Sequence, residues 1–394
     1  MKRLTTVQSI APKDNDLTPM KPSRNHRLWV TSLLAGGFAL SVGIYQWRSS
    51  SQGVQASSPP SVSTPSSPGP APNSPKAAPA PPGLFAPPRG DVRLVVISDF
   101  NSQYGSTTYA PEVTKAISLI PGWQPDLVLS GGDMVAGQSR SLNRAQLQAM
   151  WAAFDRNVAA PLRKAQLPLG FTIGNHDGSG ALSPAGRHIF TVDRQVASSY
   201  WNQQRPNLPF VDRANFPFNY SFAQDDIFYL VWDASTAKIT QEQLAWVVRS
   251  LESPAAKKAK LRIMIGHLPL YGIAVGRNKP GEYLRNAEQL RVIMERYDVH
   301  TYISGHQHAY YPGRRGQLQL LHTGALGGGP RQLVGSNLTP QKTLTVMDID
   351  YEALSTTYTT YDMKTLQVID HLKLPRQIAG QNGTVYRRDV GITP

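Results

Sequence analysis

The stretch "RLVVISDFNSQYG", Arg93 to Gly105, combines the two features that decide the fold. Its first half is apolar and rich in β-branched residues, which is typical of a buried strand. The apolar run stops at Asp99, and Asn101 follows two residues later. In open α/β sheets, ligands bind beyond the carboxyl ends of the strands. The stretch therefore predicts an α/β protein with a functional carboxylate at the end of this strand.

Four further stretches share this layout, in which an apolar strand is followed at once by Asp, Asn or His. They are "LVLSGGD" (Asp133), "FTIGNHD" (Asn175, His176, Asp177), "IMIGH" (His267) and "YISGHQH" (His306, His308). Five such strand ends are expected to converge on one spot. Carboxylate, amide and imidazole ligands together suit divalent Mn, Fe, Co, Ni or Zn. We expect the glycine before most of these residues to let the chain turn sharply out of the strand.

The remaining pattern predicts a sandwich of mixed sheets. Strand-like runs cover 93–98, 126–130, 168–173, 227–232, 261–265, 299–303, 317–322 and 343–349. Thr240 to Ser253 is predicted to be a helix, with Thr240 and Gln243 forming a capping box. Strands alternate with helices early and dominate later, which is typical of an α/β sandwich. Residues 178–215 are long, aromatic-rich and weakly patterned, and we interpret them as an insertion.

Residues 28–47 read "LWVTSLLAGGFALSVGIYQW" and carry no charge. A helix of that length spans about 30 Å, the thickness of the hydrocarbon core of a bilayer. Trp29, Tyr45 and Trp47 lie near its ends, as interfacial aromatic residues do. We therefore predict a transmembrane signal anchor, with the basic tail of residues 1–27 in the cytoplasm and the rest of the chain across the membrane.

A cleaved signal peptide, with Val54 to Ala56 as the cleavage site, is the alternative to this anchor. Residues 48–90 are dominated by Pro, Ser and Ala, which predicts a disordered linker. Such a spacer reaches on the order of 100 Å when it is extended. The catalytic domain is predicted to cover 91–375, followed by a C-terminal tail at 376–394.

The charge of the chain does not indicate a nucleic-acid-binding protein. The net charge of the 394 residues is +14, and residues 1–90 carry half of it. Residues 91–394 are therefore only mildly basic for their size, whereas nucleic-acid binding needs basic residues clustered on one surface. The chain contains no cysteine, which excludes disulfides, thiolate metal sites and cysteine nucleophiles.

Together the five stretches resemble the calcineurin-like metallophosphoesterase superfamily, which also includes the purple acid phosphatases. That family's pattern is D-x-H, G-D, G-N-H-[DE], G-H and G-H-x-H, and the order and spacing match it over 91–350. The resemblance implies a metallophosphoesterase-type α/β sandwich of two mixed β-sheets flanked by helices. It also implies metal-dependent hydrolysis of phosphate monoesters or diesters.

The resemblance assigns a role to each matching residue. Asp133 bridges two divalent metal ions with one oxygen on each. The other ligands are divided between the ions, with Asp99 and His308 on the first, and Asn175, His267 and His306 on the second. In the family, a hydroxide bridging the ions attacks phosphorus. His176, oriented by Asp177, protonates the leaving group or stabilises the transition state.

Asn101 departs from the family pattern, which has a histidine at this position. Purple acid phosphatases also lack that histidine, but supply a tyrosine three residues after the bridging aspartate, where this chain has Ala136. Three hypotheses follow. Asn101 binds the first metal through its amide oxygen, Tyr104 or Tyr109 binds as a phenolate, or the first site fills only with substrate present. An amide oxygen favours Mn or Fe over Zn.

The function predicted from these features is a membrane-tethered metallophosphoesterase facing the periplasm or the exterior. Its substrate is expected to be a phosphorylated small molecule or nucleotide, with Arg187 and Arg277 as candidate contacts; solvated surface charges are the alternative. Tyr200, Trp201 and Phe210 either stack on the substrate or form a small core. The alternative function is a non-catalytic, envelope-anchored phospho-ligand binding protein with a degenerate metal site, but His176 argues against it, because a binder needs no proton donor.

Overall fold

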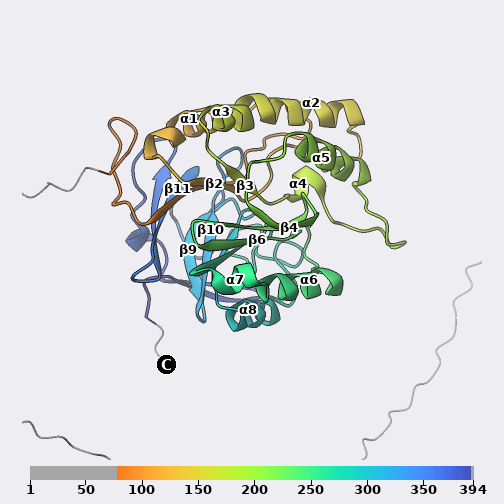
Figure 1. Ribbon diagram of the computed structural model, residues 1–394. Coiled ribbons are helices and arrows are strands. Elements are labelled where there is room, and N and C mark those ends of the chain that lie inside the picture. Colours follow the sequence, from red (N-terminus) through yellow and green to blue (C-terminus); the bar gives the residue numbers. More distant parts are fainter. Residues whose placement is uncertain (1–77, 392–394) are drawn as a thin grey trace, which may run out of the picture. The chain divides into compact units, whose positions relative to one another are not determined.

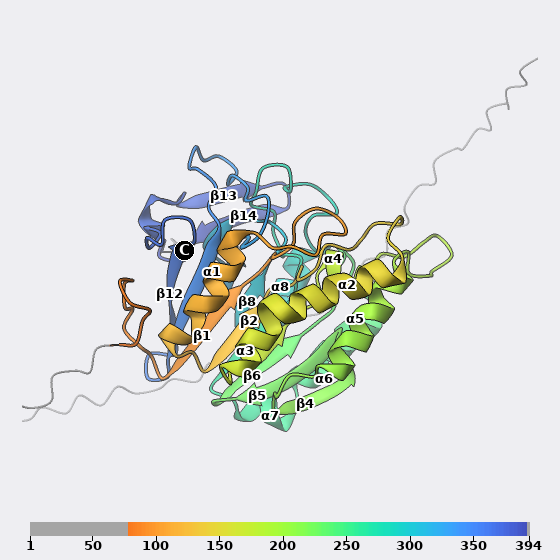
Figure 2. The ribbon, with the colours of Figure 1, turned by 90° about the horizontal axis from the view of Figure 1, so that it is seen from above.

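Two β-sheets pack face to face between two layers of helices in the computed structural model, which describes residues 78–391 (Figures 1 and 2). The first helical layer contains α1 (Pro111–Leu119), α2 (Arg144–Phe154), α3 (Ala160–Lys164) and α5 (Thr191–Gln203). The opposite layer contains α6 (Gln241–Leu251), α7 (Pro254–Lys258) and α8 (Ala287–Arg296). Short helical turns are η1 (Ile120–Trp123), η2 (Asp155–Ala159) and η3 (His371–Lys373). This arrangement confirms the predicted α/β sandwich of mixed sheets.

The first sheet has five strands in the order β12-β11-β1-β2-β3. The strands are β1 (Val92–Ile97), β2 (Leu127–Ser130), β3 (Leu169–Phe171), β11 (Thr343–Asp350) and β12 (Ser355–Asp362). Strands β1, β2 and β3 run parallel to one another, and β11 and β12 are antiparallel to their neighbours. Val95 pairs with Val128 on one side and Val346 on the other. All six residues of β1 are buried, which explains why this strand is a continuous apolar run.

The second sheet has nine strands in the order β13-β14-β9-β10-β8-β7-β6-β5-β4. The strands are β4 (Phe210–Asn215), β5 (Asn219–Gln224), β6 (Ile227–Val231), β7 (Leu261–Ile265), β8 (Val299–Ser304), β9 (Tyr310–Arg315), β10 (Leu318–Thr323), β13 (Gln377–Gly380) and β14 (Gly383–Arg387). Its centre, β6-β7-β8-β10, is parallel. Both sheets therefore direct the carboxyl ends of parallel strands toward the predicted site. Every predicted strand overlaps an observed one.

Helix α6 begins at its predicted cap, but only half of the predicted capping box forms. The Thr240 hydroxyl accepts a hydrogen bond from the Gln243 N–H, as predicted. The Gln243 side chain instead donates to the Asn219 side chain and the Asp233 carbonyl. It therefore fastens the helix to the neighbouring segments of the second sheet and leaves the Thr240 N–H without this partner.

The folded unit extends beyond the predicted boundaries at both ends. The predicted tail at 376–394 is wrong for residues up to 391, because two further strands extend the second sheet. Strand β14 pairs with β9, and β13 pairs with β14. The predicted linker, 48–90, includes residues that pack on the domain. The carbonyls of Pro79 and Pro87 accept hydrogen bonds from the buried guanidinium of Arg93.

The predicted insertion, residues 178–215, contains helix α5 and edge strand β4, and its aromatic residues face the protein interior. Trp201 is 1% exposed and stacks on Phe171 of β3. Tyr200 stacks on Trp151 of α2, and Phe210 packs edge-on against Phe216. These contacts support the interpretation of these residues as core rather than as a substrate-stacking surface.

The predicted membrane anchor, residues 28–47, lies outside the described residues. Between residues 78 and 391, no helix combines the length and the apolar character that crossing a membrane requires.

Candidate metal centre

Six of the predicted metal ligands meet at the carboxyl ends of parallel strands from both sheets. Asp99 follows β1 and Asp133 follows β2, while Asn175 begins the short helix α4 (Asn175–Gly178) after β3. His267 follows β7, and the pair His306 and His308 follows β8. All six are at most 8% exposed. The sequence pattern thus located residues that the fold brings together.

Four of these residues have a strained backbone. Asp99, Asp133, His306 and His308 have φ angles of 52°, 53°, 66° and 52°. Residues other than glycine rarely adopt this left-handed region, and such strain concentrates at functional sites. The sharp turn out of the strand therefore occurs at these residues themselves.

The neighbouring glycines have two roles. Gly132, before Asp133, has a φ of 94° and makes the expected sharp turn, whereas Gly174 and Gly305 are required for space. A Cβ on Gly174 would lie 2.1 Å from Asp133 Oδ1, and one on Gly305 would lie 2.2 Å from Ser98 Oγ. Neither glycine has a positive φ. They are small because neighbouring strand ends must approach closely enough for their side chains to share one site.

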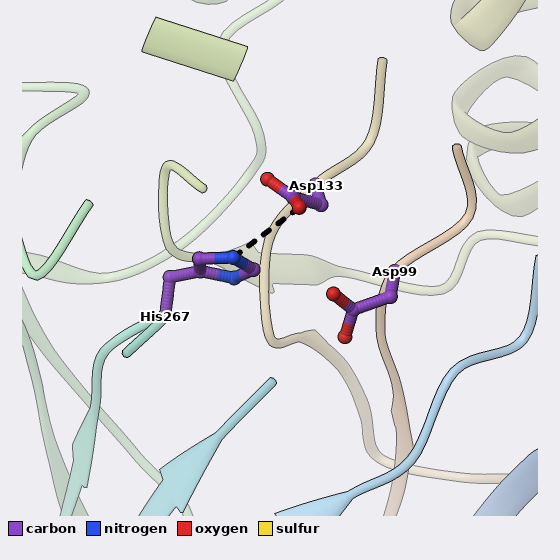
Figure 3. Close-up of side chains that lie close together, drawn as sticks. All are labelled: Asp99, Asp133 and His267. Atoms are coloured by element: carbon purple, nitrogen blue, oxygen red, sulfur yellow. Dashed lines mark ion pairs between the residues drawn. The ribbon is translucent and has the colours of Figure 1, made fainter. Parts of the chain in front are cut away.

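The residues predicted to bind the second metal bring four acceptor atoms together. Asn175 Oδ1 lies 2.9 Å from His267 Nε2 and 3.0 Å from His306 Nδ1. His267 Nε2 lies 3.3 Å from Asp133 Oδ2. Figure 3 shows the carboxylates of Asp99 and Asp133 and the ring of His267 grouped around a common space.

Hydrogen bonds behind this cluster orient its inner atoms for metal binding. Gly131 O lies 2.8 Å from His267 Nδ1 and accepts its proton, so the neutral ring directs the lone pair of Nε2 into the cluster. The Asn175 Nδ2 group donates to Gln138 Oε1 at 2.7 Å, so its Oδ1 faces the cluster. Acceptors this close repel one another unless a proton or a metal ion lies between them. Two ligands at right angles about a metal, each at roughly 2.1 Å, lie about 3 Å apart, so the donor set fits a divalent ion.

The residues predicted to bind the first metal also bring buried acceptor atoms close together. His308 Nε2 lies 3.1 Å from Asp99 Oδ1, and its Nδ1 faces the Gly329 carbonyl at 3.0 Å. His308 Nε2 and Asp133 Oδ2 are buried without a hydrogen-bond partner among the described residues. Buried polar atoms are normally satisfied, so orphaned ones indicate a missing partner such as an ion.

The two oxygens of Asp133 have different surroundings. Its Oδ1 accepts the backbone N–H of His176 at 2.9 Å, whereas Oδ2 has no backbone donor and lies 3.3 Å from His267 Nε2. Oδ2 therefore faces the cluster, and the binding of one metal by each oxygen stays a prediction. The His176 N–H fixes the carboxylate in this orientation.

The electrostatics of the cluster favour positive charge. Burial alone would lower the pKa of His267, but the charge of Asp133 and its hydrogen bonding outweigh burial and raise that pKa to about 9. The pKa values of Asp99 and Asp133 are lowered despite burial, because the charges of His308 and His267 respectively act on them. Without a cation, the cluster therefore holds a proton that a bound metal would displace.

The predicted role of Asp177 as the residue that orients His176 is wrong. Its Oδ1 accepts the N–H groups of Met134 and Val135 at 2.7 and 2.9 Å, and its Oδ2 accepts that of Gly174 at 2.8 Å. Asp177 therefore ties the loop after β2 to the start of α4. The ring of His176 is instead held by the Gly137 carbonyl, 3.1 Å from Nδ1.

Asn101 lies beside the predicted bridging residue. Its backbone N–H donates to the Asp133 carbonyl at 3.3 Å, and its side chain makes no hydrogen bond to any described residue. The Tyr109 hydroxyl donates to the Met134 carbonyl at 2.9 Å, and burial raises its pKa, which disfavours a phenolate. Tyr104 is 63% exposed, and its ring centroid lies 5.2 Å from that of His176.

The two candidate substrate contacts differ in position. Arg277 Nη1 donates to the His306 carbonyl at 2.6 Å, so this side chain lies at the cluster. Arg187 is exposed on the hairpin between α4 and α5, which projects from the sandwich, and its guanidinium makes no hydrogen bond or ion pair with any described residue (Figures 1 and 2). Glu282, which the sequence pattern did not predict, also lies at the cluster, with its Oε2 2.9 Å from His306 Nε2. No motif marks it, because it lies in the loop before α8.

A family model described as calcineurin-like phosphoesterase matches residues 92–310, which include all six clustered residues. The chain belongs to the calcineurin-like phosphoesterase family. This membership confirms the predicted enzyme class, a phosphoester hydrolase. No curated protein matches this phosphoesterase.

Solved structures similar to this phosphoesterase have low sequence identity. A purple acid phosphatase from yellow lupin (Lupinus luteus) seeds is 18% identical with a TM-score of 0.49, covering 72% of this chain and 54% of its own. A dimetal phosphatase from Danio rerio is 13% identical with a TM-score of 0.43, covering 66% and 93%. GAP50, the anchor in the inner membrane complex of Plasmodium, is 14% identical with a TM-score of 0.46, covering 71% and 86%. The phosphoesterase thus spans about half the length of the lupin protein.

Proposed function

We propose that this phosphoesterase hydrolyses phosphate esters at a dinuclear divalent metal centre. The observation that carries the proposal is the convergence of buried acceptor atoms, two of them orphaned, at the strand ends. Asp133 belongs to both sites. The other ligands would be Asp99, Asn101 and His308 at the first site, and Asn175, His267 and His306 at the second. Mn, Fe, Co, Ni and Zn all suit this donor set.

Three side chains around the cluster, His176, Arg277 and Tyr104, have roles in the proposed reaction. When bound, the metal ions supply Lewis-acid polarisation of the phosphoryl group and lower the pKa of coordinated water. The Gly137 carbonyl accepts the His176 Nδ1–H, which leaves Nε2 to carry the proton for the leaving oxygen. Arg277, which contacts His306, is a candidate cation for a substrate phosphate, and Tyr104 offers an exposed ring beside His176. We place the substrate among phosphorylated small molecules and nucleotides.

Hydrolysis of model substrates tests this function. The full-length protein is stripped of metal and assayed with p-nitrophenyl phosphate and bis-p-nitrophenyl phosphate in the presence of Mn, Fe, Co, Ni or Zn. Preference for the first compound identifies a monoesterase, and preference for the second a diesterase. Absence of hydrolysis with every metal would reject catalysis and favour the phospho-ligand binding protein.

The coordination role of Asn101 gives a separate prediction. Its side chain has no other partner, so Asn101→Ala is expected to reduce tightly bound metal from two ions to one per chain, whereas Asn101→His retains two. Metal analysis after dialysis measures this, with the exposed Asn202→Ala as the matched control. Two tightly bound zinc ions unaffected by Asn101→Ala would eliminate the amide-ligand hypothesis.

We also propose that residues 28–47 anchor the phosphoesterase in a membrane, with its catalytic domain periplasmic or extracellular. The uncharged twenty-residue run and the basic residues before it support this orientation. In fractionated cells, the protein should remain with membranes after a high-salt wash, and protease added outside the cytoplasmic membrane should digest the domain. A soluble, shortened product would instead indicate cleavage after Ala56.

A further inference from the structure

One of the three clustered histidines is held differently from the other two. His267 and His308 each face a backbone carbonyl with Nδ1, at 2.8 Å from Gly131 O and 3.0 Å from Gly329 O. His306 is reversed, because its Nε2 faces the carboxylate of Glu282 at 2.9 Å. A carboxylate can only accept this hydrogen bond, so the proton of His306 lies on Nε2.

The nitrogen that His306 presents to the cluster is therefore Nδ1. Nδ1 lies 3.0 Å from Asn175 Oδ1 and 2.9 Å from Arg277 Nη1. Arg277 Nη1 also lies 3.2 Å from Nε2, so the guanidinium contacts both ring nitrogens and does not distinguish the two tautomers. The Glu282 carboxylate beside Nε2 decides the tautomer, which leaves Nδ1 as the ligand atom of the second metal.

The loop that carries Glu282 is fastened to the site by Gln307, the residue between the two histidines. Gln307 is fully buried, and its Oε1 accepts the N–H groups of Ile273 and Ala274 at 3.0 Å each. Its Nε2 donates to the carbonyls of Arg277 and Glu282 at 3.3 and 3.0 Å. Gln307 thus uses all four hydrogen-bonding positions of its amide to hold this loop.

Arg277 lies close to both His306 and Glu282. Its Nη1 donates to the His306 carbonyl at 2.6 Å, and its Nε lies 4.0 Å from Glu282 Oε2. The side chain of Glu282 is 27% exposed, compared with 7% for His306. The carboxylate therefore stands at the edge of the cluster, within reach of solvent, while the ring it contacts lies inside.

We propose that Glu282 is a positioning residue that accepts the Nε2–H of His306, fixes its tautomer, and raises the basicity of Nδ1 toward the second metal. This role rests on the proposed dinuclear centre. Partners behind a metal-binding histidine orient the ring and strengthen the ligand, and their loss commonly weakens metal binding. Glu282 would thereby link the loop before α8 to metal affinity without touching the metal.

Metal titration of three variants of the full-length protein tests this role. Glu282→Ala should weaken Mn²⁺ binding at one of two sites by about 10- to 100-fold, because the acceptor is lost. Glu282→Gln should restore most of the affinity, because its amide oxygen still accepts the Nε2–H. Glu352→Ala, an exposed residue in the turn between β11 and β12, is the matched control. Equilibrium dialysis with metal analysis measures both sites, and circular dichroism checks the fold.

The outcomes separate this role from the proposed function. If the wild type binds two Mn²⁺ ions and Glu282→Ala binds them equally tightly, Glu282 has no positioning role. If Glu282→Gln binds as weakly as Glu282→Ala, a hydrogen bond from His306 is not what matters, and the proposal is also wrong. A wild-type protein that binds no metal would overturn the dinuclear centre and this role together.

Discussion

Asp133→Asn is expected to remove both metals from the purified protein and to lower kcat/KM by on the order of 10³-fold or more. Asp133 is fully buried, and its Oδ2 faces the cluster, 3.3 Å from His267 Nε2. In the variant, the amide oxygen can still accept the His176 N–H, so the Nδ2 group points into the cluster. An amide donor there repels a cation, and the charge that attracts both ions is lost.

The fold should survive this substitution. In the metal-free wild type, Asp99 and Asp133 repel each other, since the charge of Asp133 acts to raise the pKa of Asp99. Removing one charge relieves that repulsion. Circular dichroism should therefore match the wild type, and Asp298→Asn, whose side chain is 85% exposed, should retain metal and activity. Full activity in Asp133→Asn would mean that the chemistry does not depend on this centre.

The sequence predicted the positions of the clustered residues because their location follows from local pattern and topology. A buried parallel strand is a continuous apolar run, and the first polar residue after it lies at the edge of the sheet. Asp99, Asp133 and His267 obey this rule. Asn101, two residues after Asp99, lies beside the cluster through backbone contacts that no periodicity reveals.

The features that the sequence did not predict depend on contacts between distant segments. Glu282 reaches His306 because Gln307 fastens its loop. Glu282 stands in no recognisable motif, and Gln307 occupies the variable position of the G-H-x-H pattern. The motif residue Asp177 turned out to bind backbone N–H groups. Strand β9 reads "YYPGRR", and its Pro and Gly are unfavourable in strands, so the sequence does not predict it. Pairing with β10 nevertheless stabilises it as a strand.

The largest expected effect on stability lies at the opposite end of β1 from Asp99. Arg93 is fully buried and pairs across β1 and β11 with Asp348, with Nε–Oδ1 and Nη2–Oδ2 distances of 2.8 and 3.1 Å. The carbonyls of Pro79, Trp123 and Pro87 accept its remaining N–H groups. All five guanidinium donors are thus satisfied, and this pair joins β1, β11 and the start of the described chain.

Asp348→Ala is expected to lower the free energy of unfolding by about 3–5 kcal/mol, because it leaves a buried guanidinium without its counter-charge. Urea denaturation measures the loss. The double variant Arg93→Met with Asp348→Leu should be less destabilised than Asp348→Ala, because no unpaired charge remains. Lys260→Met removes an ion pair whose side chains are 50% and 58% exposed, and should cost less than about 1 kcal/mol.

The Asp348→Ala variant also separates the stability of the fold from metal binding. Arg93 contacts none of the clustered residues, so Asp348→Ala protein that is still folded at low temperature should bind metal with wild-type affinity and hydrolyse substrate at the wild-type rate. Activity should fall only as the unfolded fraction grows. A loss of metal affinity in the folded Asp348→Ala variant would show that β1 transmits strain from this ion pair to Asp99. If Asp348→Ala is as stable as Lys260→Met, the buried guanidinium tolerates the loss of its partner.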